Sequence, residues 1–241
     1  MEEIKAVVNW RDLDLTTAMR ILEHAGRWDR VALDLEPLAR LQALIDALCD
    51  LSMHDGLTGM MNATFFRAAL MSELDRSSRT GRALALLMFD LDRFKLVNDT
   101  YGHAVGDHVL EAAAKQLKGS LRSMDIAARI GGEEFAVILP ECSAEDAVRA
   151  ARRIHGNLNP LSVTTGDLTL NITTSAGLVW TEPSLTISPK LFMERADAEL
   201  YRAKRAGRRC LSYPELVPTR LSSAEHDSII PPRLEEDSYG Q

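Results

Sequence analysis

The chain has 241 residues, of which 28 are Lys or Arg and 35 are Asp or Glu, giving a net charge of −7. This acidic balance argues against a general binder of nucleic acid or membrane surfaces. The three cysteines are far apart in the sequence, which disfavours a disulfide framework or a structural zinc site. The N-terminus lacks the basic start and apolar core of a signal peptide, and no apolar run approaches the roughly 20 residues of a membrane span. We therefore expect a soluble, cytoplasmic protein without a membrane span.

The first 53 residues are predicted to form a helical region with a regulatory or dimerisation role. Its apolar residues Leu38, Leu41, Ile45 and Leu48 follow one another at alternating three- and four-residue steps. That is the spacing of a coiled coil, although it lasts for only about two heptads. Two interpretations stay open, namely a helix that packs on its own domain and a helix that also pairs with a second subunit.

Residues 54–213 alternate between helix and strand patterns. The apolar run at 83–92 predicts a buried strand, and the glycine pair within 126–140 predicts a hairpin of two strands. The other predicted elements are helices at 63–79, 106–122, 143–158 and 188–208, with a strand or a strand pair at 168–180. This order predicts an α/β (α+β) sandwich, in which helices flank a central, mostly antiparallel sheet. Residues 214–241 are polar and rich in proline, which predicts a disordered tail.

Two acidic segments are the first candidates for a functional site. Asp90 and Asp92 end the apolar strand, where carboxylate oxygens are well suited to hold a hard cation. Glu133 and Glu134 directly follow the glycine pair, whose backbone allows a ligand to approach closely. Either segment alone is also explained by surface acids at a strand end. Together they resemble the carboxylate set of a Mg²⁺-dependent phosphoryl or nucleotidyl transferase.

Two further groups complete the candidate site. Asn98 offers a donor and an acceptor and Asp107 only acceptors, so the pair matches the edge of guanine. The alternative is an Asn-Asp turn followed by a helix N-cap at Asp107. Lys204 and Arg208 lie four residues apart at a helix end, where they favour the helix dipole and could also bind a triphosphate.

These segments resemble the GGDEF family of diguanylate cyclases. The resemblance rests on DGLTGMMN (55–62), FDLDRFKLVNDTYGHAVGD (89–107), RSMDIAARIGGEEF (122–135) and RADAELYRAKRAGR (195–208), which occur in the family order. It implies a palm-like sandwich related to nucleotide cyclases and polymerases, which condenses two GTP into cyclic di-GMP and two pyrophosphates.

The resemblance also implies roles for individual residues. Glu133 and Glu134 would be catalytic residues. The ligands of Mg²⁺ or Mn²⁺ would be Asp90, the carbonyl of Leu91 and Glu133. Asn98 and Asp107 would recognise guanine. The phosphates would be bound by Phe94, Lys95, Lys204 and Arg208. Each domain would hold one GTP, so the resemblance implies a homodimer.

An RxxD motif precedes the signature by five residues. By the resemblance, Arg122 and Asp125 form an inhibitory site for the product, cyclic di-GMP, and Arg153 supports it, with Arg149 and Arg152 as alternatives. A surface salt bridge is the competing interpretation of the motif. The chain departs from the family pattern LTxLxNR at Ala63, which replaces the arginine and puts the anchoring of this loop in question.

An active diguanylate cyclase is therefore the first hypothesis. The second is a catalytically silent receptor that binds cyclic di-GMP through the RxxD site. A cyclase with relaxed base choice is a third, and Asp107 argues against it.

Overall fold

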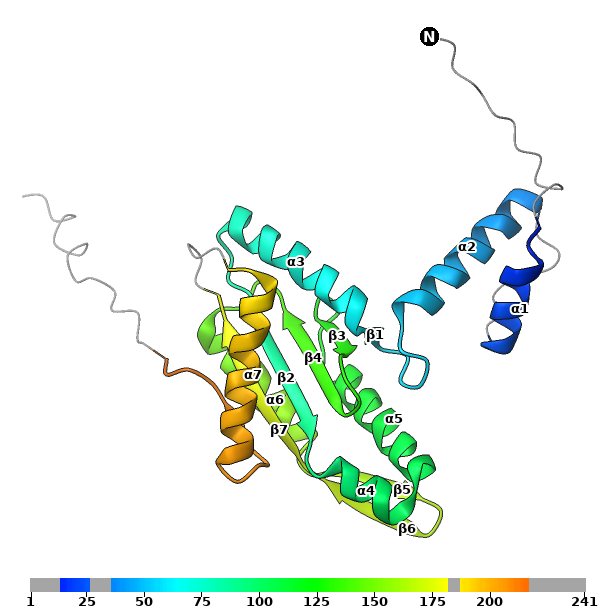
Figure 1. Ribbon diagram of the computed structural model, residues 1–241. Coiled ribbons are helices and arrows are strands. Elements are labelled where there is room, and N and C mark those ends of the chain that lie inside the picture. The colour runs from blue at the N-terminus through cyan, green and yellow to red at the C-terminus, as the bar shows by residue number, and fades with distance from the viewer. Residues whose placement is uncertain (1–13, 27–35, 182–186, 217–241) are drawn as a thin grey trace, which may run out of the picture.

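The computed structural model describes residues 14–26, 36–181 and 187–216 (Figure 1). The predicted tail from 217 onwards and the first 13 residues lie outside this part of the chain. Leu216, within the predicted tail, is described and packs partly buried against the core. None of the helices in the described segments is both long and apolar enough to cross a membrane.

The centre of the fold is a six-stranded sheet, which confirms the predicted fold class. Its strand order is β1-β3-β4-β2-β7-β8, and the four inner strands pair antiparallel. The two edge strands are only two residues long and pair parallel with their neighbours. The strands are β1 (Met61–Asn62), β2 (Ala85–Leu91), β3 (Ile126–Arg129), β4 (Glu134–Leu139), β7 (Thr174–Trp180) and β8 (Leu211–Ser212).

Helices cover both faces of this sheet, as Figure 1 shows. Every residue of β2 is buried, because alternate side chains enter two separate cores. Leu86 and Met88 face α3 and α7, whereas Leu87 and Phe89 face α5 and α6. These helices are α3 (Ala63–Thr80), α5 (His103–Gly119), α6 (Ala144–Asn157) and α7 (Pro189–Arg205).

Some elements were not predicted, and of the alternatives at 168–180 two strands occur rather than one. A short helix, α4 (Phe94–Tyr101), follows β2 directly. The strand pattern at 168–180 divides into β6 (Leu168–Ile172), which pairs with β5 (Leu161–Thr165) in a separate hairpin, and β7 in the main sheet.

The predicted N-terminal helices are described as α1 (Thr16–His24) and α2 (Pro37–Met53). They pack on each other through Leu22, Leu44 and Ala47, away from the sheet (Figure 1). The coiled-coil stripe of α2 is only partly free of this packing, since Leu38 is 78% exposed and Ile45 is 46% exposed, whereas Leu48 packs against the cluster. The helix therefore packs on α1 through a face that includes Leu48, and it leaves Leu38 and Ile45 of the stripe exposed.

Candidate active site

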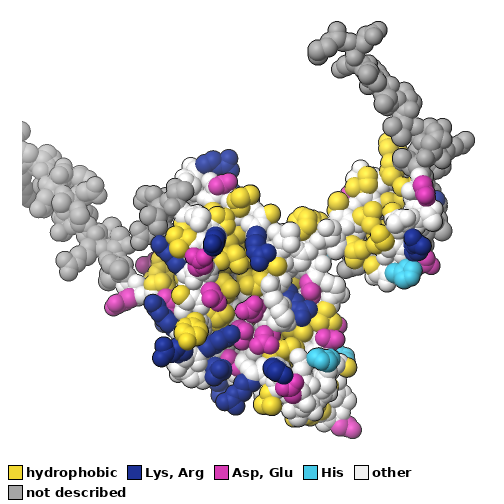
Figure 2. Space-filling model, in the orientation of Figure 1, with side chains coloured by type: hydrophobic (Ala, Val, Ile, Leu, Met, Phe, Trp, Pro, Cys, Tyr) yellow, Lys and Arg dark blue, Asp and Glu magenta, His cyan; other side chains and the backbone are white. Residues whose placement is uncertain are grey.

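The two acidic segments meet at one end of the sheet. Asp90 of β2 lies opposite Glu134 of β4 in the antiparallel register, so their side chains leave the same face. The N–H of Leu91 donates to the carbonyl of Glu133 at 3.2 Å, which ties the signature turn to β2. Figure 2 shows acidic side chains gathered in the middle of this face, with Lys and Arg side chains beside them on the α7 side. The structure therefore brings the predicted carboxylates together.

These carboxylates crowd one another in a partly dry environment. Asp90 is only 5% exposed, and burial raises its pKa even though Lys204 Nζ lies 2.7 Å from its Oδ2. Burial also raises the pKa of Glu133, and the charge of Asp90 raises it further. A bound cation would relieve both effects, because it compensates the buried negative charge.

The donor set fits a cation that is shared with a substrate. Within the described part of the chain, no three His, Cys, Asp or Glu side chains lie together as a complete metal site. Asp90 and Glu133 provide two carboxylates. Mg²⁺ is commonly held by one or two carboxylates, with substrate phosphates and water completing its shell. The site thus suits Mg²⁺ with a nucleotide better than Mg²⁺ alone.

Arg129 fastens the signature turn from behind. Its Nη2 donates to the carbonyl of Gly132 at 2.8 Å, and its Nε donates to the carbonyl of Gly131 at 3.2 Å. Its Nη1 reaches Asp55 at 3.2 Å. A Cβ on Gly131 would come within 2.3 Å of Glu134 Oε2, so a larger residue at this position would displace the carboxylate of Glu134. The shape of the turn therefore depends on residues outside it.

Asp55 organises the loop that joins α2 to the sheet. Its Oδ1 accepts hydrogen bonds from the N–H and the hydroxyl of Thr58, at 2.9 and 2.6 Å. Burial alone would raise the pKa of Asp55, but the bonds from Thr58 and Arg129 outweigh it and lower that pKa. Sequence reasoning quoted Asp55 within a motif but gave it no role, and it missed Arg129.

Asn62 anchors the loop in which Ala63 replaces the arginine of the family pattern. Its side chain caps α3 by accepting from the N–H groups of Thr64 and Phe65, at 3.0 and 3.1 Å. Its amide nitrogen also donates to the carbonyl of Ser52 at 2.6 Å. The loop is anchored by this asparagine, without an arginine at 63.

The predicted guanine-reading residues lie on two adjoining helices. Asn98 is in α4, and its Oδ1 occupies the space beside Gly106, where a Cβ would come within 1.9 Å. Asp107 is exposed in the second turn of α5. The alternative of an Asn-Asp turn and an N-cap at Asp107 is wrong, because Asn98 is helical and α5 begins at His103.

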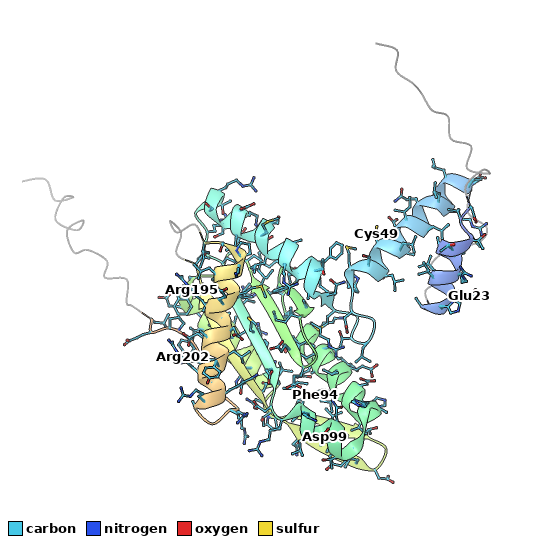
Figure 3. The ribbon with its side chains drawn as sticks, viewed as in Figure 1. Glu23, Cys49, Phe94, Asp99, Arg195 and Arg202 are labelled. Carbon is cyan, nitrogen blue, oxygen red and sulfur yellow. The ribbon has the colours of Figure 1, made fainter. Side chains whose placement is uncertain are left out.

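The four predicted phosphate-binding residues are placed differently from one another. Figure 3 shows Phe94 where β2 gives way to α4. The side chain of Phe94 is 5% exposed in the core, which leaves its backbone N–H as the group available at the helix start. Lys95 is exposed and paired with Asp99 at 2.8 Å. Lys204 contacts Asp90, and Arg208 is exposed in the turn after α7.

Asp92, the second acid of the same segment, forms hydrogen bonds within the protein and no ion pair with Lys204. Its carboxylate is 8% exposed and accepts from the hydroxyls of Thr173 and Ser175, at 2.7 and 2.6 Å. It also accepts from the backbone N–H of Arg209 at 3.0 Å. These bonds tie together the ends of β2 and β7 and the turn before β8.

The RxxD residues form a turn between α5 and β3. The N–H of Arg122 donates to Asp125 Oδ2 at 2.8 Å, and the N–H of Asp125 returns a bond to the carbonyl of Arg122 at 3.1 Å. Both residues line an open cleft of about 470 Å³. This contact uses the backbone of Arg122, so the motif is not a simple salt bridge.

Of the three candidate arginines, Arg153 contacts the segment that leads into this turn. Its guanidinium donates to the carbonyl of Ser120, at the end of α5. Arg149 pairs with Asp146 of its own helix, and Arg152 donates to the hydroxyl of Tyr213.

Comparison with known proteins gives a consistent result. Residues 52–210 match the family described as "Diguanylate cyclase, GGDEF domain". The chain is 40% identical over 159 residues to "Probable diguanylate cyclase DgcC" of Escherichia coli K12, an alignment that covers 66% of this chain and 42% of that protein. The chain spans between 36% and 48% of the lengths of the curated relatives it matches.

Two solved structures resemble more than the matched domain. The diguanylate cyclase SiaD of Pseudomonas aeruginosa, solved in complex with its activator SiaC, has a TM-score of 0.67 and 34% identity, covering 85% of this chain and 78% of that one. The coiled coil and GGDEF domain of DgcB from Caulobacter crescentus, solved with c-di-GMP, has a TM-score of 0.69 and 27% identity, covering 83% of this chain and all of that one.

Proposed function

Because the chain belongs to the diguanylate cyclase GGDEF-domain family, we propose that it condenses two GTP into cyclic di-GMP and two pyrophosphates. The observation that carries this proposal is the meeting of Asp90 and Glu133 at one end of the sheet, with Lys204 beside them. A buried and a partly buried carboxylate next to a cationic side chain suit a nucleoside triphosphate with its metal ion. GTP is a cytoplasmic nucleotide, which supports a cytoplasmic location.

Each polar group has a part in the proposed reaction. Asp90, Glu133 and the carbonyl of Leu91 would hold Mg²⁺ or Mn²⁺. When bound, the cation neutralises phosphate charge and lowers the pKa of the attacking 3′-hydroxyl. Glu134 adds a second acid at the signature turn. Guanine is read by Asn98 and Asp107, and the phosphates are held by Lys95, Lys204, Arg208 and the backbone at Phe94.

The reaction requires two copies of the domain, since one GTP supplies the 3′-hydroxyl and the other the α-phosphate. We propose that α2 promotes this homodimer through the stripe Leu38, Leu41, Ile45 and Leu48, of which Leu38 and Ile45 are exposed. Dimerisation then supplies the proximity that a bimolecular reaction between two bound nucleotides needs.

Cyclic di-GMP is proposed to inhibit the enzyme at the cleft beside Arg122 and Asp125. The backbone bond between them leaves the guanidinium of Arg122 available for a guanine or a phosphate. Arg153 is the supporting arginine, because it reaches the carbonyl of Ser120 close to this turn. The receptor hypothesis is less favoured, since a silent receptor would not need the acidic turn.

The test is product analysis after incubation of the full chain with Mg²⁺ and GTP, using chromatography and mass spectrometry. Nucleotide already bound to the purified protein is extracted and identified first. We expect cyclic di-GMP from GTP, and none from Asp90→Asn. Asp167→Asn, an exposed acid in the β5–β6 turn, is the matched control and should keep full activity.

Unchanged turnover in Asp90→Asn would show that the metal assignment is wrong. Absence of turnover in the wild-type protein, with cyclic di-GMP bound at purification, points to product inhibition or to a receptor. Arg122→Ala separates these two cases, because only an inhibited enzyme should then gain activity.

A further inference from the structure

Asp92 is a buried acid whose partners are all neutral donors. No Lys, Arg or His side chain of the described residues forms an ion pair with its carboxylate, although Asp90, two residues earlier, has Lys204. Both carboxylate oxygens are engaged by the three donors described above. Asp92 therefore has a different task from Asp90, although the two residues belong to one motif.

The bonds of Asp92 hold a turn whose backbone is strained. Arg208 and Arg209 are consecutive non-glycine residues with positive φ, of 65° and 53°. Such a backbone persists only where its surroundings determine it. Within the described residues, the N–H of Arg209 is fixed by Asp92 at 3.0 Å, and the N–H of Arg208 by the carbonyl of Ala203 at 3.1 Å.

This turn sets the direction of the Arg208 side chain. It follows α7 at the end where Lys204 reaches Asp90, and the charge of Arg208 also acts on the Asp90 carboxylate. Arg208 and Arg209 line a cleft of about 410 Å³ together with Arg93. A different backbone at 208–209 would point the guanidinium of Arg208 elsewhere.

We infer that Asp92 is a positioning residue for triphosphate binding, which acts by fixing the turn at 207–209 and so the direction of Arg208. This inference rests on the proposed function, because it takes Arg208 as a phosphate-binding residue. In this role Asp92 contacts neither the metal nor the nucleotide, and its three hydrogen bonds are all to the protein itself.

Substitutions of Asp92 distinguish a positioning role from a role as a metal ligand. Asp92→Ala removes all three acceptor bonds, and we expect KM for GTP to rise about tenfold with a much smaller change in kcat. Asp92→Asn should restore KM, because its amide oxygen can accept from Thr173 and Arg209 while its NH₂ donates to the Ser175 hydroxyl. A metal ligand would behave differently, since Asn would raise the Mg²⁺ concentration needed for turnover.

A double-mutant cycle tests whether the effect passes through Arg208. If it does, Asp92→Ala will raise KM no further in a protein that already carries Arg208→Ala. Additive effects of the two changes, or Asp92→Asn as impaired as Asp92→Ala, would overturn the inference. Should Asp92→Ala fail to fold, Thr173→Val removes one donor to the same carboxylate, and the same cycle applies.

The affinity for a GTP analogue that cannot react is measured in parallel by calorimetry in Mg²⁺. We expect the same tenfold weakening in Asp92→Ala, and the same lack of a further effect with Arg208→Ala. This readout does not need turnover, so a protein that stays inactive even with Arg122→Ala would refute the proposed function while the cycle still decides on Asp92. Analogue binding that Asp92→Ala leaves unchanged would refute the inference.

Discussion

Arg129 and Asp55 form an ion pair between the signature turn and the loop after α2. The two residues are 74 positions apart in the chain, and Arg129 Nη1 lies 3.2 Å from Asp55 Oδ1. The same guanidinium holds the carbonyls of Gly131 and Gly132. One side chain thus connects the entrance of the domain with the turn that carries Glu133.

Arg129→Lys should weaken turnover more than stability. Lysine keeps the charge but cannot reach Asp55 and both glycine carbonyls at once, because it lacks the planar fork of arginine. We expect kcat to fall about tenfold and the free energy of unfolding by about 1–2 kcal/mol. Steady-state kinetics and urea unfolding measure the two quantities. Arg152→Lys, on the surface of α6, is the control, and an equal loss there would contradict the explanation.

Gly106→Ala should disturb nucleotide selection without harming the fold. The new Cβ would come within 1.9 Å of Asn98 Oδ1 and within 3.2 Å of a ring carbon of Phe94, so the amide must move. Alanine otherwise favours a helix by about 0.5–1 kcal/mol over glycine. We expect KM for GTP to rise about tenfold or more and discrimination against ATP to fall. Gly119→Ala, in open space on the same helix, should leave both unchanged.

Gly177→Ala should destabilise the whole domain. A Cβ at this position of β7 would come within 2.2 Å of the backbone nitrogen of Leu200 and within 2.4 Å of the carbonyl oxygen of Ala196. These are backbone atoms of α7, which cannot rotate away. We expect a loss of about 2–4 kcal/mol in urea unfolding. Gly156→Ala, with nothing within 4 Å, is the matched control, and a similar loss there would refute the close approach as the cause.

His155 should make stability depend on pH. Burial lowers its pKa below the usual value, despite the bond of Nε2 with the carbonyl of Thr174 at 3.0 Å. As the pH falls, this histidine therefore becomes protonated at about pH 6.5 in the unfolded chain and only at a lower pH in the folded chain. Stability contributed by neutral His155 is present above that pH and is lost as the pH falls through the lower folded pKa. Thermal unfolding between pH 5 and 8 should show this slope, and His155→Gln should flatten it while exposed His24→Gln should not.

Arg153→Ala should relieve product inhibition, if the proposed inhibitory site is correct. We expect the cyclic di-GMP concentration for half inhibition to rise about tenfold, as for the loss of one charged hydrogen bond. Arg149→Ala removes a pair within α6 and should leave inhibition near the wild-type value. Inhibition curves at fixed GTP measure both variants, and the opposite ranking would assign the role to Arg149.

The sequence predicted the elements whose pattern is local. The buried strand at β2, the hairpin of β3 and β4 and the helix capped by Ser143 all appear as predicted. Strong hydrophobic patterning and side-chain capping act over a few residues, so they are visible in the chain. The antiparallel sheet followed from their order.

Features that depend on contacts between segments far apart in the chain could not be predicted from local sequence patterns. The short helix α4 was missed because Asn98 and Asp99 favour turns, while the burial of Phe94 and Val97 holds them in a helix. Asp92 resembled Asp90 by spacing, and only the fold brings Thr173 and Ser175 to it. The partner of Arg129 likewise lies 74 residues away.

The very short edge strands limit how two copies can associate. β1 and β8 offer only two residues each as templates for a further strand. A neighbouring molecule therefore gains little by extending the sheet, and a continuous intermolecular sheet is disfavoured. Two such domains would meet through side chains rather than through a shared backbone ladder. The strength of such a contact then depends on the side chains that two copies present to each other and not on strand pairing in the main sheet.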